Sequence, residues 1–225
     1  MSQKPTISVD VISDVVCPWC YIGQKRLEKA AAATPEVKVD IRWRPYQLDP
    51  TIPPEGKDRK AYMLAKFGSE ERLRQIHDRI MPIGAAEGID FHFEDIRIAA
   101  NTLDAHRVIR WAASVGEGVQ NRVVKALFAA NFEKGKYIGD REELVRIASE
   151  NGMDGALVAS LLASDADKAE VQAEIEEAQR MGVTGVPCFL LEGKYAVMGA
   201  QDTEVIADAI RQVAEMKASG QLAAG

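Results

Sequence analysis

The residues of this sequence best suited to chemistry are two cysteines, Cys17 and Cys20, in the motif CPWC. The run Ile7–Ile12 before them has the character of a strand, and residues 21–33 are good helix sequence. Cys17 therefore falls where a helix begins, among unpaired backbone N–H groups at the positive end of the helix dipole, which favours a thiolate. Cys20 follows about one helical turn later. The pattern indicates a redox-active dithiol in which Cys17 attacks and Cys20, of higher pKa through burial, resolves.

A CxxC pair can instead hold zinc, but a zinc site needs two further ligands. Beyond the pair the chain has only Cys188 and the histidines His77, His92 and His106, with no second CxxC and no HxxxH spacing. We therefore expect no metal site. Three cysteines also cannot form a fully paired disulfide framework, which favours redox chemistry in a reducing compartment.

Composition limits the classes of partner. The chain has 225 residues, of which 47% are hydrophobic and 28% charged, as in ordinary globular proteins. The net charge of −6 argues against a nucleic-acid partner, which would need a basic face. No apolar run is long enough to cross a membrane, and residues 1–5 lack the apolar segment of a secretory signal. We expect a cytoplasmic protein with no membrane partner.

The strand patterns lie at the two ends of the chain. Alternating apolar residues over 37–43 predict a strand that completes a βαβ unit with the first strand and the dithiol helix. Strand character returns at 188–191 and 195–198, joined by a Glu192-Gly193 turn as a β-hairpin. Asp202 then caps a final amphipathic helix. This order, β-α-β and then β-β-α, is the thioredoxin arrangement.

The middle of the chain is helical in pattern and has no strand-like run of its own. The expected helices are 60–67, 70–80 ending before Pro82, one whose apolar stripe runs from Ile96 to His106, 119–134, one capped by Asp140, and 165–181. We therefore predict an α/β, thioredoxin-like fold with a large all-helical insertion. Residues 1–57 and 182–225 would form the thioredoxin-like domain and 58–181 the insertion.

The segment GVTGVP, residues 182–187, directly precedes the hairpin. A proline at the start of a strand is tolerated only where its missing N–H is not needed. Together with the upstream CxxC, this position predicts a cis-proline loop opposite the dithiol, with an ordinary turn proline as the alternative. Val186, just before Pro187, would present its backbone to a bound peptide or to glutathione. Pro18 and Trp19 shape the turn between the cysteines, and Trp19 brings no positive charge there.

Three segments in this order resemble the DsbA-like thioredoxin-fold proteins, and most closely their FrnE-like branch. They are CPWCYIG, NTLDAHR at 101–107, and GVTGVPCF followed by GAQ. The resemblance covers nearly the whole chain. It implies a thiol–disulfide oxidoreductase of reductase or isomerase type, acting on a disulfide-bearing protein or a low-molecular-weight thiol, with no tightly bound cofactor. The oligomeric state stays open, and a homodimer is one option.

The same superfamily contains kappa-class glutathione transferases and 2-hydroxychromene-2-carboxylate isomerases, which usually have serine in place of Cys17. This chain keeps both cysteines, which favours dithiol chemistry and leaves glutathione as a candidate co-substrate. The alternative function is a glutathione-dependent isomerase or transferase acting on a small aromatic molecule. A non-catalytic, chaperone-like module is a third reading.

Five more residues are candidate contacts for substrate or glutathione, each with a structural alternative. Asn101 lies on another face of its helix and can bind across to a loop, whereas His106 lies on the apolar stripe and is more typical of a core histidine. Cys188 is either a buried strand residue or a third redox thiol. Gln201 and Asp202 begin the last helix, where Asp202 is a cap or, as in the glutathione-binding relatives, helps to hold the γ-glutamyl end.

Overall fold

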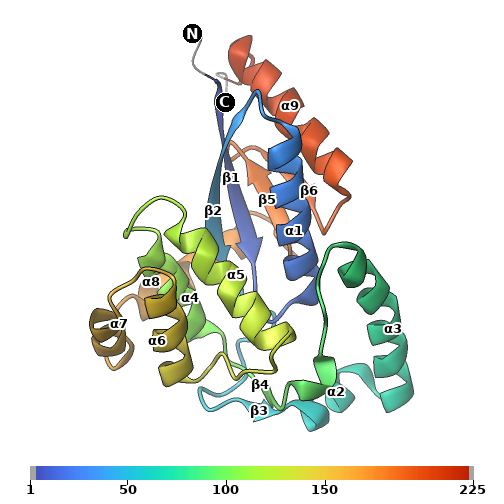
Figure 1. The fold of residues 1–225 in the computed structure, drawn as a ribbon, viewed down its shortest axis with the longest axis vertical. Helices are drawn as coiled ribbons and strands as arrows, with labels where there is room; N and C mark the ends of the chain where they lie inside the picture. The colour runs from blue at the N-terminus through green and yellow to red at the C-terminus, as the bar shows by residue number, and fades with distance from the viewer. Residues whose placement is uncertain (1–3, 223–225) are drawn as a thin grey trace.

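The computed structural model describes residues 4–222, and its centre is a four-stranded sheet in the order β2-β1-β5-β6 (Figure 1). The strands are β1 (Thr6–Ser13), β2 (Lys38–Pro45), β5 (Cys188–Leu191) and β6 (Tyr195–Met198). β1 and β2 are parallel, with helix α1 (Pro18–Ala33) as the crossover between them, and β5 and β6 continue the sheet in antiparallel pairing. Helix α9 (Thr203–Ala218) packs along α1. The predicted thioredoxin-like topology is confirmed.

The core follows from the alternation within β1. Its residues Ile7, Val9 and Val11 point to one face and are fully buried, and Val11 pairs with Trp43 on one side and Phe189 on the other. Ile12 points to the opposite face, where it meets Cys188 in a smaller apolar cluster. Successive side chains of β1 thus point to opposite faces of the sheet, and apolar residues are buried on both faces.

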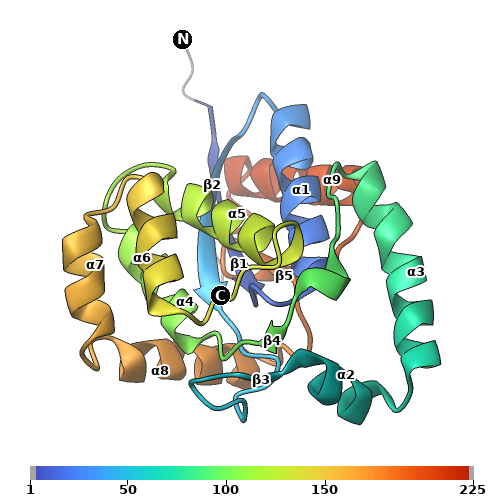
Figure 2. The same ribbon diagram turned by 60° about the horizontal axis from the view of Figure 1, so that its bottom comes forward.

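The segment between β2 and β5 is helical. Its helices are α2 (Arg59–Phe67), α3 (Glu70–Ala86), α4 (Leu103–Ala112), α5 (Val119–Phe132), α6 (Arg141–Glu150), α7 (Gly155–Leu162) and α8 (Lys168–Arg180), with one 3₁₀ turn, η1 (Phe93–Asp95). α4, α5 and α8 pack against the β2 edge of the sheet. α2 and α3 form a separate arm near the N-terminal end of α1 (Figures 1 and 2). The division into domains at 57/58 and 181/182 stays a prediction.

The expectation that the insertion has no sheet of its own is wrong. Lys57–Asp58 (β3) pairs antiparallel with Ile98–Ala99 (β4). The helical stripe predicted from Ile96 is interrupted there, and α4 begins only at Leu103, whose N–H donates to the side chain of Asn101. Two-residue strands leave no periodicity that distinguishes them from the first turn of a helix.

One helix is longer than predicted, and one helix was not predicted at all. α3 runs through Pro82 to Ala86. Pro82 is exposed, so water can bond the carbonyl that loses its N–H partner at the proline. α7 was not expected from the sequence pattern; its N-terminus is capped by Asp154, which accepts from the N–H groups of Ala156 and Leu157.

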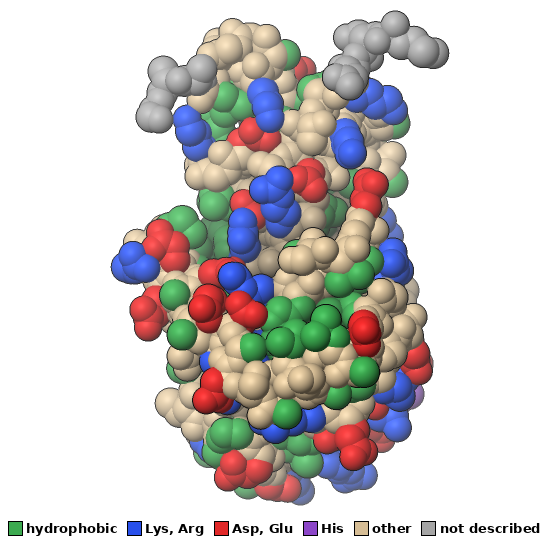
Figure 3. All heavy atoms as spheres, turned by 90° about the vertical axis from the view of Figure 1, so that its left-hand side faces the viewer, with side chains coloured by type: hydrophobic (Ala, Val, Ile, Leu, Met, Phe, Trp, Pro, Cys, Tyr) green, Lys and Arg blue, Asp and Glu red, His purple; other side chains and the backbone are tan. Residues whose placement is uncertain are grey.

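The surface is mixed in charge. On the face shown in Figure 3, acidic and basic side chains are interspersed around an apolar area. That face therefore lacks the continuous basic surface that a nucleic-acid partner needs. Within residues 4–222, no helix combines the length and the apolarity needed to cross a bilayer.

One buried cation joins the helices of the insertion. Arg107 on α4 is completely buried. It donates hydrogen bonds to the carbonyl of Leu161 in the last turn of α7 and to those of Ser164 and Ala166, which follow that helix. Its remaining guanidinium nitrogen bonds Asp104, 2.7 Å away. A planar group with five donors suits this cluster of acceptors, because it satisfies several otherwise unpaired carbonyls at once.

We predict that Arg107→Met destabilises the protein by about 3 kcal/mol or more, because it leaves buried carbonyls and the Asp104 carboxylate without a donor. Chemical unfolding monitored by circular dichroism measures this. Arg146→Met is the matched control, since Arg146 is 44% exposed and pairs with Glu143 and Glu150 at the surface, where we expect less than about 1 kcal/mol. Equal losses in both variants would contradict the role assigned to Arg107.

Candidate active site

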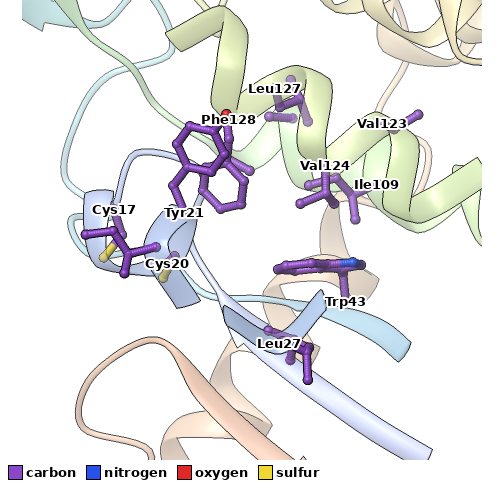
Figure 4. Packing of buried hydrophobic residues seen from close by; sticks show 14 of the residues in the cluster. Cys17, Cys20, Tyr21, Leu27, Trp43, Ile109, Val123, Val124, Leu127 and Phe128 are labelled. Atoms are coloured by element: carbon purple, nitrogen blue, oxygen red, sulfur yellow. The ribbon is translucent and has the colours of Figure 1, made fainter. Parts of the chain in front are cut away.

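The dithiol lies at the N-terminus of α1, as the sequence predicts. Cys17 is the N-cap residue, with extended backbone angles, and Pro18 occupies the first helical position, where its missing N–H has no intrahelical role. The N–H of Cys17 donates to the Asp14 carbonyl and that of Cys20 to the Cys17 carbonyl, both at 3.0 Å. Figure 4 shows both sulfurs at this end of the helix. All three cysteines are free thiols.

The two thiols differ in environment. Cys17 is 5% exposed and lines a cavity, whereas Cys20 is 1% exposed and belongs to the core. Burial raises the pKa of the Cys20 thiol well above its ordinary value, and its hydrogen bond and electrostatic interaction with Cys17 raise that pKa further. The predicted higher pKa of Cys20 through burial is confirmed. Cys20 therefore stays protonated at neutral pH in the free dithiol.

The loop before β5 lies opposite Cys17. The Val186–Pro187 peptide bond is cis, and the Cys17 Sγ lies 3.8 Å from the Val186 carbonyl oxygen. Pro187 also touches α1, because a Cβ on Gly23 would lie 2.9 Å from the Pro187 Cγ and 3.1 Å from the Phe189 ring. Only a residue without a side chain fits between the helix and this loop. The sequence analysis singled out the proline but not the glycine that admits it.

A cavity of about 390 Å³ adjoins the dithiol. Cys17, Pro18, Trp19 and Val186 line one part of it. Trp19 is 38% exposed, so its ring forms part of the rim. Most of the remaining wall comes from the loop after β2 and from the helical insertion, and it is mostly apolar, with Ile52, Met63, Ile80, Phe93 and Ile96 among its residues. The four residues predicted to shape the site, Pro18, Trp19, Val186 and Pro187, are thus brought together around Cys17.

His106 is a buried structural histidine. Its Nε2 lies 2.8 Å from the Tyr46 carbonyl oxygen and 3.4 Å from the Asp14 Oδ1. Asp14 is itself buried and accepts from the Leu48 N–H through its other oxygen. His106 does not line the cavity, whereas Asp14 does. The sequence analysis passed over Asp14, although an acid three residues before a nucleophilic cysteine is a visible signal.

Asn101 binds across to a loop, as predicted. Its side-chain NH₂ donates to the Ile52 carbonyl at 2.6 Å, and its Oδ1 accepts from Gln47 and from the Leu103 N–H. Both ends of the amide are therefore used inside the protein. Asn101 fixes the loop after β2, one wall of the cavity, rather than reaching into the cavity itself.

The remaining candidates lie elsewhere. Cys188 is buried beside Ile12, and burial raises the pKa of its thiol. Gln201 donates to the Met198 carbonyl. Asp202 occupies the N-cap position of α9, but the expectation that its side chain caps the helix is wrong, because its carboxylate instead pairs with Arg26 at 2.9 Å. None of the three lines the cavity beside Cys17.

No group of three or more His, Cys, Asp or Glu side chains gathers in metal-binding geometry within the described range 4–222. Besides its thiols, the site has charged groups on the cavity wall. Two of these groups, Arg59 and His77, come from α2 and α3. The sequence offers Arg59, with Lys57 and Lys60, as a basic cluster that could hold a carboxylate or simply be solvated, whereas His77 has no recognisable signal.

Two solved structures share the fold at low sequence identity. A 2-hydroxychromene-2-carboxylate isomerase aligns with a TM-score of 0.70 at 20% identity, covering 94% of this chain and 98% of that one. The cytosolic disulfide reductase DsbM from Pseudomonas aeruginosa, with GSH, aligns with a TM-score of 0.61 at 20% identity, covering 94% and 99%.

A closer likeness comes from Streptomyces coelicolor. A probable DsbA oxidoreductase from that organism is 35% identical, with a TM-score of 0.82, over 92% of this chain and 89% of that chain. Residues 8–211 also match the family model described as a DSBA-like thioredoxin domain. These findings confirm the resemblance inferred from the sequence and are consistent with its FrnE-like branch. The chain belongs to the DSBA-like thioredoxin domain family.

Proposed function

We propose that this protein is a thiol–disulfide oxidoreductase of reductase or isomerase type, which exchanges its Cys17–Cys20 dithiol with disulfides of protein or glutathione substrates. One observation carries the proposal. Cys17 faces the Val186 carbonyl and cis-Pro187 in the wall of a cavity, while Cys20 lies one turn deeper in the core. One thiol can thus meet a substrate and the other can meet only its neighbour.

The exchange has two steps. The Cys17 thiolate attacks one sulfur of the substrate disulfide, so that a mixed disulfide forms and the other substrate sulfur leaves as a thiolate that takes up a proton. Cys20 then loses its proton and attacks the Cys17 Sγ, which releases the second substrate thiol and leaves a Cys17–Cys20 disulfide. An external thiol donor must reduce that disulfide before the next turnover.

The raised pKa of Cys20 fits this order of events. While Cys17 is a thiolate, its charge opposes a second charge on Cys20. Once Cys17 has formed the mixed disulfide, that charge is gone and the hydrogen bond between the two sulfurs changes. The proton of Cys20 then leaves more readily, so the resolving thiolate appears only after the attack.

Glutathione is the proposed co-substrate, with no tightly bound cofactor, because electrons can enter and leave through thiols alone. DsbM, a cytosolic disulfide reductase with the same fold, has been solved with GSH, which supports this choice. We also propose a cytoplasmic location, where the glutathione pool favours reductase or isomerase duty over net oxidation.

A glutathione-dependent isomerase acting on a small aromatic molecule is the second candidate. The apolar cavity beside Cys17 favours it, since its volume suits a small molecule. In that reaction Cys17 would orient the glutathione thiol and Cys20 would not be consumed. The two candidates therefore differ in their need for Cys20.

We predict that Cys17→Ser lowers disulfide-reductase turnover by roughly a thousandfold or more, because a hydroxyl cannot replace the thiolate. Cys20→Ser also abolishes turnover, but it traps a mixed disulfide at Cys17. Glutathione-coupled reduction of insulin measures turnover, and mass spectrometry of the intact protein detects the adduct.

Cys188→Ser is the matched control, since Cys188 lies outside the cavity and its loss leaves turnover unchanged. If Cys20→Ser kept full turnover of a small molecule with glutathione and formed no trapped adduct, the isomerase would be the better assignment. Holdase activity that survives the loss of both cysteines, without turnover in the parent, would instead support a chaperone-like module.

We predict that Trp19→His raises the reduction potential of the Cys17–Cys20 couple by tens of millivolts, because a positive charge beside Cys17 stabilises the reduced form and about 30 mV corresponds to about 1.4 kcal/mol. Equilibration with glutathione buffers, followed by alkylation of free thiols, gives the potential. Trp19→Phe is the neutral control and should stay near the parent. An unchanged or lower reduction potential in Trp19→His would contradict this prediction.

A further inference from the structure

We propose that the cavity beside Cys17 selects a small disulfide or thiol with an apolar body and one anionic group, which Arg59 and His77 bind. This inference rests on the proposed function and names its substrate class. It comes from two polar side chains that the dithiol mechanism does not use, and that share one apolar wall with the nucleophile.

The size and lining of the cavity favour a small molecule. Its volume of about 390 Å³ lies near the lower end of the range for small-molecule sites. Side chains of α2 and α3, such as Met63 and Ile80, help to enclose it, together with Phe93 and Ile96 from the segment before β4. An apolar lining of this kind stabilises an apolar body but leaves any charged group in need of a specific partner.

Arg59 is a cation that forms no direct ion pair among the described residues, and the charge of Glu94 acts on it only from a longer distance. It is the first residue of α2, and its Nη1 donates only to the Phe93 carbonyl, at 3.3 Å. No carboxylate of residues 4–222 lies within ion-pair distance of it, and burial lowers the pKa of its guanidinium. The adjacent Lys60, by contrast, is exposed and pairs with Glu70 at 2.7 Å. A half-buried guanidinium that forms no direct ion pair gains from an anionic ligand that replaces the water it has lost.

A second, independent observation is that His77 is nearly buried and that, within residues 4–222, its ring has no hydrogen-bond partner. Its side chain is nearly buried, with 7% of the residue exposed, and its ring stacks on Phe93 with centroids 4.2 Å apart. Neither ring nitrogen has a hydrogen-bond partner among the described residues; the nearest carboxylate, on the exposed Glu94, is 3.9 Å away. Burial lowers the pKa of His77, so the imidazole is neutral at pH 7 and has one N–H to donate.

Phe93 brings these two groups together. Its carbonyl holds Arg59 and its ring carries His77, so the guanidinium and the imidazole lie on the same stretch of cavity wall. A carboxylate there can accept from both, in the manner of other anion sites that combine Arg with a neutral donor. The apolar part of the molecule would then fill the cavity between this wall and Cys17.

The other charged groups of the cavity favour the same orientation. The Asp14 backbone is bonded to Cys17, so Asp14 lies at the nucleophile's end and repels an anion there. Asp49 is bonded to Thr51, and Lys66 lies over the ring of Tyr62. An anionic substrate is therefore held with its charge at Arg59 and His77 and its sulfur toward Cys17.

Two aromatic disulfides test this proposal on the reduced enzyme: dithiobis(nitrobenzoate), which has a carboxylate on each ring, and the uncharged dithiobis(nitropyridine). In both reactions the Cys17 thiolate forms a mixed disulfide and releases one coloured aryl thiolate. Cys20 then displaces the second, leaving the protein disulfide. We expect Arg59→Met to lower the second-order rate constant for the nitrobenzoate disulfide by roughly tenfold or more, with little change for the nitropyridine disulfide. Stopped-flow absorbance measures both rates.

Lys60→Met is the matched control, since it removes the same charge from an exposed neighbour outside this cavity. His77→Phe keeps the stack on Phe93 and removes the N–H, so it should lower only the nitrobenzoate rate; it also replaces Arg59→Met if that variant does not fold. Equal losses with both probes, or no loss with either, would overturn the anion site while the proposed function stands. If the parent enzyme reduced neither probe and no protein disulfide, the proposed function itself would fail.

Discussion

The contact between Gly23 and Pro187 is the constraint on which the active site depends. It lets α1 lie directly against the loop before β5, closer than any side chain on the helix would permit. β5 is paired with β1, and β1 leads into the loop that carries Cys17. The Gly23–Pro187 contact and the β1–β5 pairing therefore hold α1 and the loop before β5 together from two sides. They set the position of the Cys17 sulfur relative to the Val186 carbonyl. The dithiol and the loop opposite it are thus held together by this packing as well as by the hydrogen bond from the Cys17 thiol to the Val186 carbonyl.

Residues of the helical segment between β2 and β5 enclose the cavity beside Cys17. Asn101 ties the loop after β2 to the start of α4, and the His106–Tyr46 hydrogen bond holds the other end of the same loop. Farther out, Arg107 fastens the end of α7 to α4. These three residues come from one short stretch of sequence, and each uses its polar atoms inside the protein. Their effect on chemistry is to fix the shape of a wall rather than to touch a substrate.

Much of this arrangement could be predicted from the sequence, because it is local or periodic. The alternating strands, the cysteine at a helix start and the proline before Cys188 all have signals within a few residues. The rest depends on contacts distant in sequence. The β3–β4 pair is too short for periodicity, Asp202 turns from its helix toward Arg26, and Arg59 and His77 meet only because both pack on Phe93. No pattern in one chain distinguishes such a half-buried arginine from the exposed Lys60 beside it.

The origin of the cavity wall has an evolutionary consequence. The two thiols and the backbone facing them come from the start of α1 and the loop before β5, whereas most of the groups that would meet the body of a substrate come from the stretch between β2 and α4. Reactivity and selectivity are therefore encoded in separate parts of the chain. Substitutions in α2 and α3 can alter which molecule reaches the sulfur while the geometry of the sulfur itself is preserved. A fold divided in this way can change what its cavity admits by small steps, each leaving the arrangement of the two thiols intact.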